Sequence, residues 1–263
     1  MPIIDSLPTS LLSEPEANLN SLKTSIRNQA LLILTELSSI RLDWKYTLLI
    51  GLVSPVSFLL LLSLFVKGDN EALTYIVSGN MVLTQVTGTM LSLGQEMGVL
   101  KEIRGFDYYS TLPISKMNLV IAHVTKATLL SMPSILMIWF LGNKVFYANI
   151  TLTFSSIIIL LLSGYTLSAI GAVIGTRARD AEQASVITQV VNPILTFCSP
   201  VFVPENYLPR WLNTISYLFS TRYVAAALRN SMSGTNDPFP IAMVLFFCLI
   251  SIFLVNKFMD WRV

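Results

Sequence analysis

The sequence predicts an all-α integral membrane protein with six transmembrane helices. Hydrophobic residues make up 53% of its 263 residues and charged residues only 12%, and the mean hydropathy is +0.66. A soluble domain carries about 25% charged residues, so this composition is typical of a chain that lies largely in lipid. A helix needs about 20 apolar residues to cross a bilayer. Six stretches meet that requirement, at 46–66, 73–93, 118–141, 150–176, 184–203 and 239–258.

The residues ahead of the first span predict an amphipathic helix that lies in the inner membrane surface. Its apolar residues recur every three or four positions, at Leu19, Leu22, Ile26, Ala30, Ile33, Leu37, Ile40 and Trp44. Lys23, Arg27 and Glu36 lie off that stripe, and Ser13 with Glu16 fits a capping box. A soluble helix packed on a partner is the alternative. No signal peptide is visible, so we expect a cytoplasmic and interfacial region, 1–45, and a membrane domain, 46–263.

The second predicted span is the most polar of the six. Its apolar run is interrupted by Asn80, Thr84, Gln85, Thr87 and Thr89. Polar side chains are unfavourable against lipid, so we expect this helix to face protein or water.

The segment between the second and third spans, 95–116, predicts a short amphipathic helix. Its charged residues alternate in sign: Glu96, Lys101, Glu102, Arg104, Asp107 and Lys116. Leu100, Ile103, Phe106 and Tyr108 or Tyr109 would form an apolar stripe, and Pro113 would end the helix. Two spans would hold this helix at the membrane face, where it suits a groove on a cytoplasmic protein. A solvated loop with aromatic residues is the alternative.

The fourth and fifth predicted spans contain a glycine motif and two amide residues, and each of these features has two possible interpretations. The fourth contains the G-x-x-x-G motif Gly171–Gly175, which favours close helix approach either inside one subunit or between two. The fifth contains Gln189, Asn192 and Pro193. Its two amides could bond to a neighbouring helix or to a substrate, because polar residues inside a membrane are either packing or functional groups.

The region between the fifth and sixth spans, 204–234, predicts short helices that dip into the outer leaflet. Its apolar stripe consists of Leu208, Trp211, Leu212, Ile215 and Leu218. Irregular backbone at that depth must be shielded by protein or by a water-filled cavity.

The distribution of lysine and arginine predicts that both termini are cytoplasmic. Eleven of these residues fall on the inner side: Lys23, Arg27, Arg41, Lys45, Lys101, Arg104, Lys116, Arg177, Arg179, Lys257 and Arg262. Five fall on the outer side: Lys67, Lys144, Arg210, Arg222 and Arg229. Lys126 lies inside the third span.

The sequence offers little for catalysis. It has no G-x-x-x-x-G-K-[ST] phosphate loop, and we expect no cluster of carboxylate, histidine or cysteine side chains at one depth. His123, the only histidine, precedes Lys126 by three residues, and we interpret both as interfacial side chains rather than a proton relay. Cys198 and Cys248 are expected to be buried small hydrophobes. We therefore expect no metal and no cofactor in this chain, and the net charge of +2 does not indicate nucleic acid.

The chain resembles the permease subunits of type-2 ABC exporters, a family that exports drugs, lipids and polysaccharides. The resemblance covers nearly the whole chain and is carried by three motifs in order, "EIRGFDYYSTLPISK", "SPVFVPENYLP" and "YVAAALRNSMSG". It implies an interfacial helix, six spans, a cytoplasmic coupling helix between spans two and three, and short outer helices after span five.

The resemblance also implies roles and partners. Two copies of a separate ATP-binding subunit, which carries the ATP and Mg²⁺, would bind the coupling helix through Glu102, Arg104, Gly105, Phe106, Asp107 and Tyr108. Gly105 would permit a turn or a close backbone approach. A second permease protomer, identical or not, would complete the pathway in the plasma (inner) membrane. The residues expected to face that pathway are Thr84, Gln85, Gln189 and Asn192.

The expected cargo is a hydrophobic or amphipathic drug or lipid-like molecule. Polysaccharide-exporting members carry a basic, aromatic entry to the first span, and "RLDWKYTLLIGLVSP" matches that entry poorly. A permease for polysaccharides or lipid-linked glycans, a membrane-embedded enzyme and a structural membrane protein without transport activity are the alternatives. The enzyme would need a cluster of reactive side chains at one depth.

Overall fold

The computed structural model describes residues 14–66, 70–111, 114–148, 150–235 and 237–258, and every regular element in these ranges is helical. In chain order the elements are α1 (Glu14–Phe65), α2 (Asn70–Val86), the π-helix η2 (Thr87–Leu91), α3 (Ser92–Glu102), α4 (Gly105–Ser110), α5 (Lys116–Lys144), α6 (Phe154–Arg177), α7 (Ala181–Phe197), the short helix η3 (Glu205–Tyr207), α8 (Arg210–Ser216), α9 (Ser220–Ser233) and α10 (Pro238–Phe258).

Helices lie at all six predicted spans, but they differ in how well they fit a bilayer. Among the described residues, α5, α6 and α10 are long and apolar enough to cross a membrane, and Gly51–Leu64 within α1 is a shorter apolar stretch. The second predicted span is divided into α2, η2 and α3, which follow one another directly. The fifth is shorter than predicted, because α7 ends at Phe197 and residues 198–203 form turns and bends.

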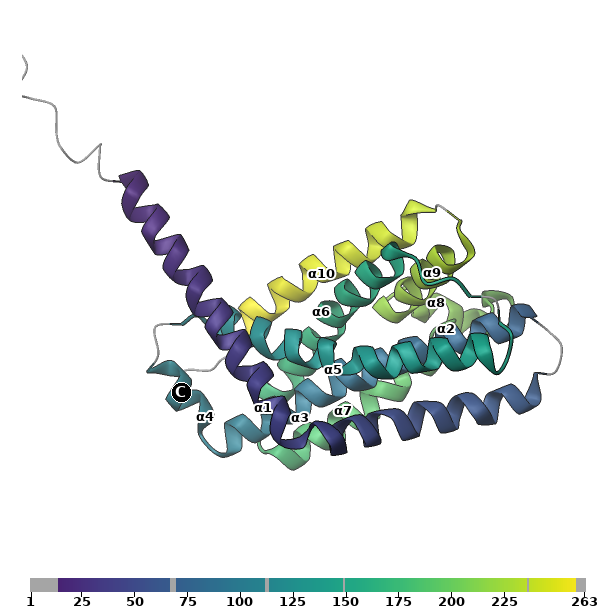
Figure 1. The fold of residues 1–263 in the computed structure, drawn as a ribbon, viewed down its shortest axis with the longest axis horizontal. Helices are drawn as coiled ribbons and strands as arrows, with labels where there is room; N and C mark the ends of the chain where they lie inside the picture. The colour runs from purple at the N-terminus through teal and green to yellow at the C-terminus, as the bar shows by residue number, and fades with distance from the viewer. Residues whose placement is uncertain (1–13, 67–69, 112–113, 149, 236, 259–263) are drawn as a thin grey trace, which may run out of the picture.

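α1 joins the predicted interfacial helix to the first predicted span in one helix of 52 residues. Figure 1 draws it as two arms that meet at a sharp bend, with the second arm lying along the bundle. Ser13 and Pro113 lie outside the described residues, as do the side chains before Arg27 and at 39–50. Glu36, which lies off the predicted apolar stripe, is buried. Part of the polar face of α1 therefore contacts protein.

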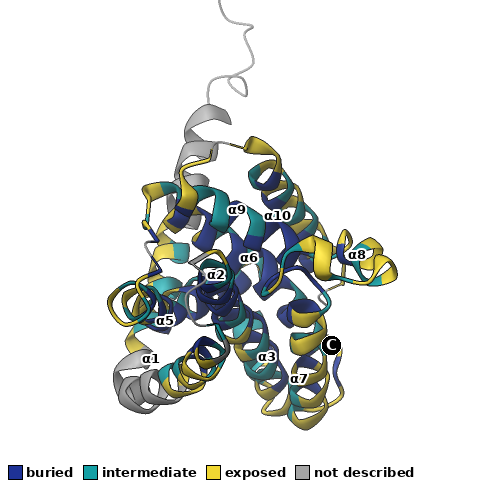
Figure 2. Ribbon diagram, turned by 90° about the vertical axis from the view of Figure 1, so that its right-hand side faces the viewer, coloured by how far each residue is buried: buried dark blue, intermediate teal, exposed yellow. Residues whose placement is uncertain are grey.

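α6 lies at the centre of the bundle (Figure 2) and packs against α3, α5, α7, α9 and α10. Its small residues permit this close packing. A Cβ atom on Gly171 would lie 2.1 Å from the Met90 carbonyl oxygen, and one on Gly175 would lie 2.3 Å from that of Gly94. The G-x-x-x-G motif therefore packs α6 against η2 and α3 of the same chain, which is the approach inside one subunit that the sequence allowed.

The region after α7 folds back onto the bundle. α9 packs against α10, α6 and α2, whereas much of η3 and α8 is exposed, including Trp211 and Ile215 of the predicted apolar stripe. The position of these short helices in the outer leaflet stays a prediction. The Arg222 side chain is buried and donates hydrogen bonds to Asn213 Oδ1 (2.5 Å) and Ser216 Oγ (2.6 Å), and it pairs with Glu205 Oε2 (2.6 Å). Arg222 thereby fixes η3 and α8 to the start of α9.

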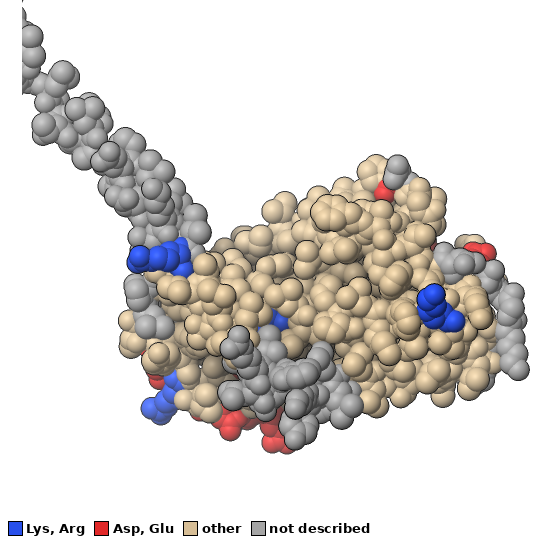
Figure 3. Space-filling view, viewed as in Figure 1, with Lys and Arg blue, Asp and Glu red and all other residues tan. Residues whose placement is uncertain are grey.

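Charged side chains on the face shown in Figure 3 lie mainly toward the two ends of the molecule, with a largely uncharged belt between them. One end holds α4, the start of α5 and the end of α10 (Figure 1). Here Lys116 Nζ donates to the carbonyl oxygen of Asn256 (2.5 Å), and Arg177 Nε donates to that of Phe258 (2.9 Å). We call this end of the molecule the α4 end.

Candidate functional site

The α4 end is shaped by the corner between α3 and α4. Arg104 lies between the two helices with φ of 55°, in the left-handed region, so the chain turns at this residue. Gly105 was predicted to permit either a turn or a close backbone approach, and the structure shows the close approach. A Cβ atom there would lie 2.9 Å from Leu100 Cδ2 and 3.2 Å from the Leu100 carbonyl oxygen. The glycine therefore allows α4 to approach the end of α3 closely.

Two side chains tie this corner to the loop between α6 and α7. Lys101 Nζ donates to the carbonyl oxygens of Thr176 (3.0 Å) and Ala178 (2.6 Å). Glu102 Oε2 accepts a hydrogen bond from the backbone N–H of Ala181 (3.1 Å), the first residue of α7. The two loops at the α4 end are therefore joined into one surface.

α4 has one buried and one exposed face. Phe106 is 6% exposed and packs in a small core with Leu93, Met97 and Leu119. The predicted docking residues on the other side are exposed: Glu102, Arg104, Asp107 and Tyr108. Ile103, which was predicted only as part of the apolar stripe, is also exposed. The Phe106 ring thus holds α4 on its own bundle, and Ile103 and Tyr108 are the large apolar groups on the open face.

A cluster of titratable side chains lies beside the Phe106 core. Lys126 Nζ from α5 is 2.6 Å from Glu96 Oε1 on α3 and 3.1 Å from Glu36 Oε2 on α1. His123 Nδ1 lies 3.3 Å and 3.5 Å from the same two oxygens. Tyr109 of α4 donates to Glu36 Oε1 (3.2 Å). We call these five residues the charge cluster; it joins α1, α3, α4 and α5.

The electrostatics of the charge cluster depend on its partial burial. Burial alone would raise the pKa of Glu96, but the neighbouring His123 and then Lys126 outweigh it, and the pKa falls to about 2. Burial and the Glu36 carboxylate raise the pKa of Tyr109 to about 12. Glu96 is therefore held as a carboxylate and Tyr109 as a neutral hydrogen-bond donor.

The charge cluster corrects two sequence-based expectations. A set of carboxylate and histidine groups does gather at one place, and His123 is buried rather than interfacial. Its members come from helices distant in the chain, so residue spacing could not reveal it; the signal was Glu36 lying off the apolar stripe. The Glu36, Glu96 and His123 ligand atoms lie within 4.8 Å of one another, close enough to hold a metal ion. The Lys126 ammonium contacts both carboxylates and supplies a positive charge there.

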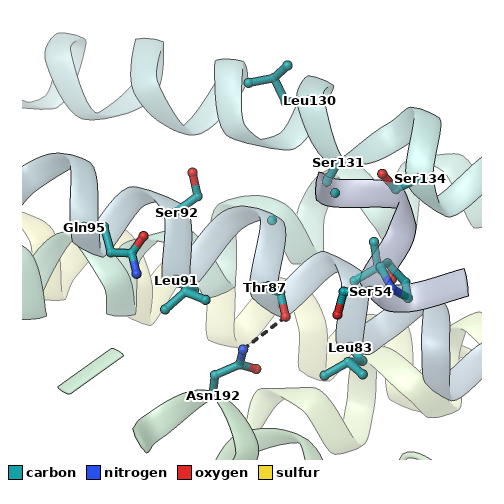
Figure 4. Close-up of a pocket in the computed structure, with 14 residues that line it drawn as sticks. Ser54, Leu83, Thr87, Leu91, Ser92, Gln95, Leu130, Ser131, Ser134 and Asn192 are labelled. Atoms are coloured by element: carbon teal, nitrogen blue, oxygen red, sulfur yellow. Dashed lines mark hydrogen bonds between the residues drawn. The ribbon is translucent and has the colours of Figure 1, made fainter. Parts of the chain in front are cut away.

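A cavity of about 650 Å³ lies between α1, α2, η2, α3, α5 and α7 (Figure 4). Its apolar lining includes Pro55, Leu83, Leu91 and Leu130, and its polar lining consists of hydroxyls and amides: Ser54, Thr84, Thr87, Ser92, Gln95, Ser131, Ser134 and Asn192. Asn192 Nδ2 donates to Thr87 Oγ1 (3.0 Å), which links α7 to η2. This volume and lining are typical of a site for a small molecule.

The structure separates the four residues that were predicted to face a pathway. Thr84 and Asn192 line the cavity. Gln85 is fully buried, where its Nε2 donates to the Leu160 carbonyl oxygen (3.2 Å) and its Oε1 accepts from Ser131 Oγ (3.1 Å). Gln189 is exposed, and its Nε2 donates to Ser185 Oγ (2.8 Å). Sequence alone could not distinguish these positions, because all four are polar residues in apolar helices.

A family model described as ABC-2 type transporter matches residues 29–233, a range that contains α4, the charge cluster and the residues that line the cavity. The chain is 26% identical over 250 residues to a transport permease, ycf38, of Porphyra purpurea, covering 82% of this chain and 83% of that protein. It is 26% identical over 204 residues to a daunorubicin resistance ABC transporter permease protein of Streptomyces coeruleorubidus, covering 73% and 70%. A ycf38 protein of Pyropia yezoensis is similar at 26% over 208 residues, covering 72% and 69%.

Proposed function

The chain belongs to the ABC-2 type transporter family, and from this premise we propose that it is the permease subunit of an ATP-driven exporter. Members of this family are membrane transport subunits that work with separate ATP-binding subunits. In our proposal two copies of the ATP-binding subunit carry ATP and Mg²⁺, and two permease protomers form the pathway. The observation that carries the proposal is the family match, because it covers most of the chain.

We propose that the α4 end faces the cytoplasm of a plasma (inner) membrane. The basic residues assigned to the inner side include Lys101, Arg104, Lys116 and Arg177, and in the described structure these four lie at the α4 end. An excess of lysine and arginine marks the cytoplasmic side of a membrane protein. In this orientation the six spans would be formed by α1, by α2 with η2, and by α5, α6, α7 and α10. The first arm of α1 would lie along the inner surface, and α3 from residue 95 onward would lie on the cytoplasmic side.

We propose that the open face of α4 receives the ATP-binding subunit. The face offers apolar groups, Ile103 and Tyr108, between charges of both signs, Glu102, Arg104 and Asp107. A few buried anchors surrounded by a polar rim are what a docking surface needs. The bonds from Lys101 and Glu102 to the α6–α7 loop would pass a movement of α4 to α6 and α7 as well as to α3.

We propose that the cavity is part of the export pathway and that its cargo is a drug or lipid-like amphipathic molecule. The cavity combines apolar walls with hydroxyl and amide groups, which suits such a cargo. The relative from Streptomyces coeruleorubidus is named for daunorubicin resistance, and this name supports a drug as the cargo here.

The proposal is tested by purifying the tagged full-length chain from the membranes of its own cells and asking whether an ABC ATP-binding subunit is captured with it. We expect the two to co-purify and the complex, reconstituted in nanodiscs, to hydrolyse ATP. A variant of the ATP-binding subunit without its phosphate-loop lysine is the matched control, which should co-purify without hydrolysis. If no ATP-binding subunit is captured and no hydrolysis is measured, the chain is not an exporter permease, and a structural role takes its place.

A further inference from the structure

We propose that the cavity selects uncharged cargo that can donate a hydrogen bond, and that the side-chain oxygen of Asn192 accepts this bond. The inference rests on the proposed function, and it narrows the cargo from amphipathic molecules in general to neutral ones. It is carried by three features of the cavity: the charge of its lining, the state of the Asn192 amide, and the geometry of η2.

The lining carries no ionisable side chain among the described residues that form the cavity wall. A charged headgroup that enters such a cavity loses its water and finds no counter-ion, which is strongly unfavourable. The nearest candidate in sequence is Glu96, which follows the lining residue Gln95. Its carboxylate is already engaged by Lys126 (2.6 Å) and His123 (3.3 Å) in the charge cluster. Within the described lining, therefore, no side chain would compensate the charge of a cationic or an anionic cargo.

Asn192 supplies a specific hydrogen-bonding group. Its Nδ2 donates to Thr87 Oγ1, which fixes which way the amide points. Its Oδ1 is buried and makes no hydrogen bond with the described protein. A buried acceptor without a partner is destabilising by about 1 to 3 kcal/mol. A ligand hydroxyl or N–H group would remove this cost once the Asn192 amide turns its oxygen toward the cavity. In Figure 4 the Asn192 amide lies at the cavity wall beside Thr87.

The π-helix η2 forms the wall beside Asn192. Its residues Thr87, Gly88 and Leu91 line the cavity. A Cβ atom on Gly88 would lie 2.7 Å from Ser131 Cβ, so the glycine lets η2 and α5 meet there. Short π-helical turns inside α-helices are uncommon and often occur at functional sites. The irregular turn thus coincides with the cavity rather than with the charge cluster or the α4 end.

The experiment uses the complex of the full chain with its ATP-binding subunit in nanodiscs. Displacement of radiolabelled 1-O-dodecylglycerol is measured with four probes of equal chain length: dodecylglycerol itself, its dimethyl ether, dodecyl phosphate and dodecyltrimethylammonium. Empty nanodiscs correct for partition into lipid. We expect dodecylglycerol to bind at least about tenfold more tightly than either charged probe, and about fivefold more tightly than the ether, which lacks the donor.

Two variants locate the effect. Asn192→Asp places an acid in the cavity and should shift the preference toward dodecyltrimethylammonium by about tenfold. Asn206→Asp adds the same charge on the exposed η3 and should leave the preference unchanged. Equal affinity for neutral and charged probes, no saturable binding, or an Asn192→Asp preference identical to that of the unchanged chain would each overturn the inference. Basal ATP hydrolysis in the same nanodiscs tests the proposed function separately, because it does not require any of the probes.

Discussion

Lys126 contacts carboxylates from two other helices, and this arrangement explains how a chain with few charges accommodates five titratable groups at one partly buried place. Glu36 and Glu96 each approach the ammonium within hydrogen-bond distance. Removing one partner of a fully buried ion pair is destabilising by about 3 to 5 kcal/mol, since the remaining charge loses its compensation. The Lys126 and Glu96 side chains are 17% and 28% exposed, so the cost here should lie below that range. The cluster is therefore a point where single substitutions have large effects.

The lowered pKa of Glu96 predicts a specific acid sensitivity. Its carboxyl has a pKa of about 2 in the folded protein, below its ordinary value of 4.5, so its charge contributes stability above pH 4.5. That contribution is lost as the pH falls toward 2. Thermal unfolding in detergent should show the unchanged chain losing on the order of 2 kcal/mol more than Glu96→Gln between pH 6 and pH 3.

Glu182→Gln is the control for this measurement, because Glu182 is an exposed glutamate in the first turn of α7. Its pH profile should run parallel to that of the unchanged chain. If the Glu96→Gln profile also ran parallel, the charge cluster would not hold Glu96 as a carboxylate in the way described.

Gln85 and Thr84 are adjacent in sequence, and the structure predicts opposite consequences of changing them. Gln85→Leu removes two buried hydrogen bonds and should lower stability by about 1 to 3 kcal/mol. Thr84→Val keeps the side-chain shape at the cavity wall and should leave the unfolding temperature nearly unchanged while altering transport. Thermal unfolding in detergent and cargo transport in vesicles measure the two effects. If the Gln85→Leu protein were stable and its cargo range were altered, Gln85 would be a pathway residue and not a packing residue.

At the scale of elements, one face of α4 packs on the bundle, and in our proposal the other face binds the ATP-binding subunit. Tyr108→Ala removes an exposed side chain and should leave the permease folded while weakening capture of the ATP-binding subunit by about 2 kcal/mol, or roughly 30-fold. Phe106→Ala removes a ring from the small core and should lower stability by about 3 to 5 kcal/mol. Co-purification and thermal unfolding of both variants distinguish the two roles.

Tyr207→Ala is the matched control for Tyr108, because Tyr207 is also an exposed tyrosine and lies on η3, away from α4. Capture should be normal in this variant. Normal capture by Tyr108→Ala as well would remove the open face of α4 from the docking proposal and leave the α6–α7 loop as the next candidate.

The second predicted span shows the limit of reasoning about single elements. Its polar residues predicted that it would face protein or water, and Asn80, Gln85 and Thr89 are indeed buried while Thr84 and Thr87 line the cavity. The division into α2, η2 and α3 was not predicted. The π-helical turn occurs where η2 is in close contact with α5 and α6, at Gly88 and Gly171. Such contacts join distant segments of the chain, so the local sequence could not predict the turn.

For the whole molecule, the proposed topology predicts the labelling of single cysteines in sealed cells. In a chain whose Cys198 and Cys248 are replaced by serine, cysteines at Glu102 and Asp180 should be protected from an impermeant reagent, and one at Tyr207 should react. The structure adds an internal check: Glu102 bonds to Ala181 N–H, the residue next to Asp180, so these two sites must give the same answer. Labelling of both from outside would reverse the orientation and remove the docking proposal.

Much of the fold could be predicted from the sequence, and the site could be predicted only in part. Hydrophobic runs locate the helices because lipid imposes a minimum length on each, and the charged segment 95–116 does contain a short amphipathic helix. Side-chain roles depend on which helix faces which, and this follows from contacts between distant segments. Phe106 and Tyr108 look alike as aromatic residues of one short helix, yet one is buried and the other exposed.

The members of the charge cluster are synthesised in a fixed order, and this order bears on how Lys126 enters the membrane. Glu36 is made 90 residues before Lys126, and Glu96 is made 30 residues before it. At about 5 to 20 residues per second, roughly 5 to 20 s pass between the first carboxylate and the lysine. A lysine inside a membrane helix is unfavourable by about 2.5 to 3.5 kcal/mol when it enters lipid alone. In this chain both carboxylates are synthesised before the lysine, so Glu36 and Glu96 are available to pair with Lys126 when its helix enters the membrane.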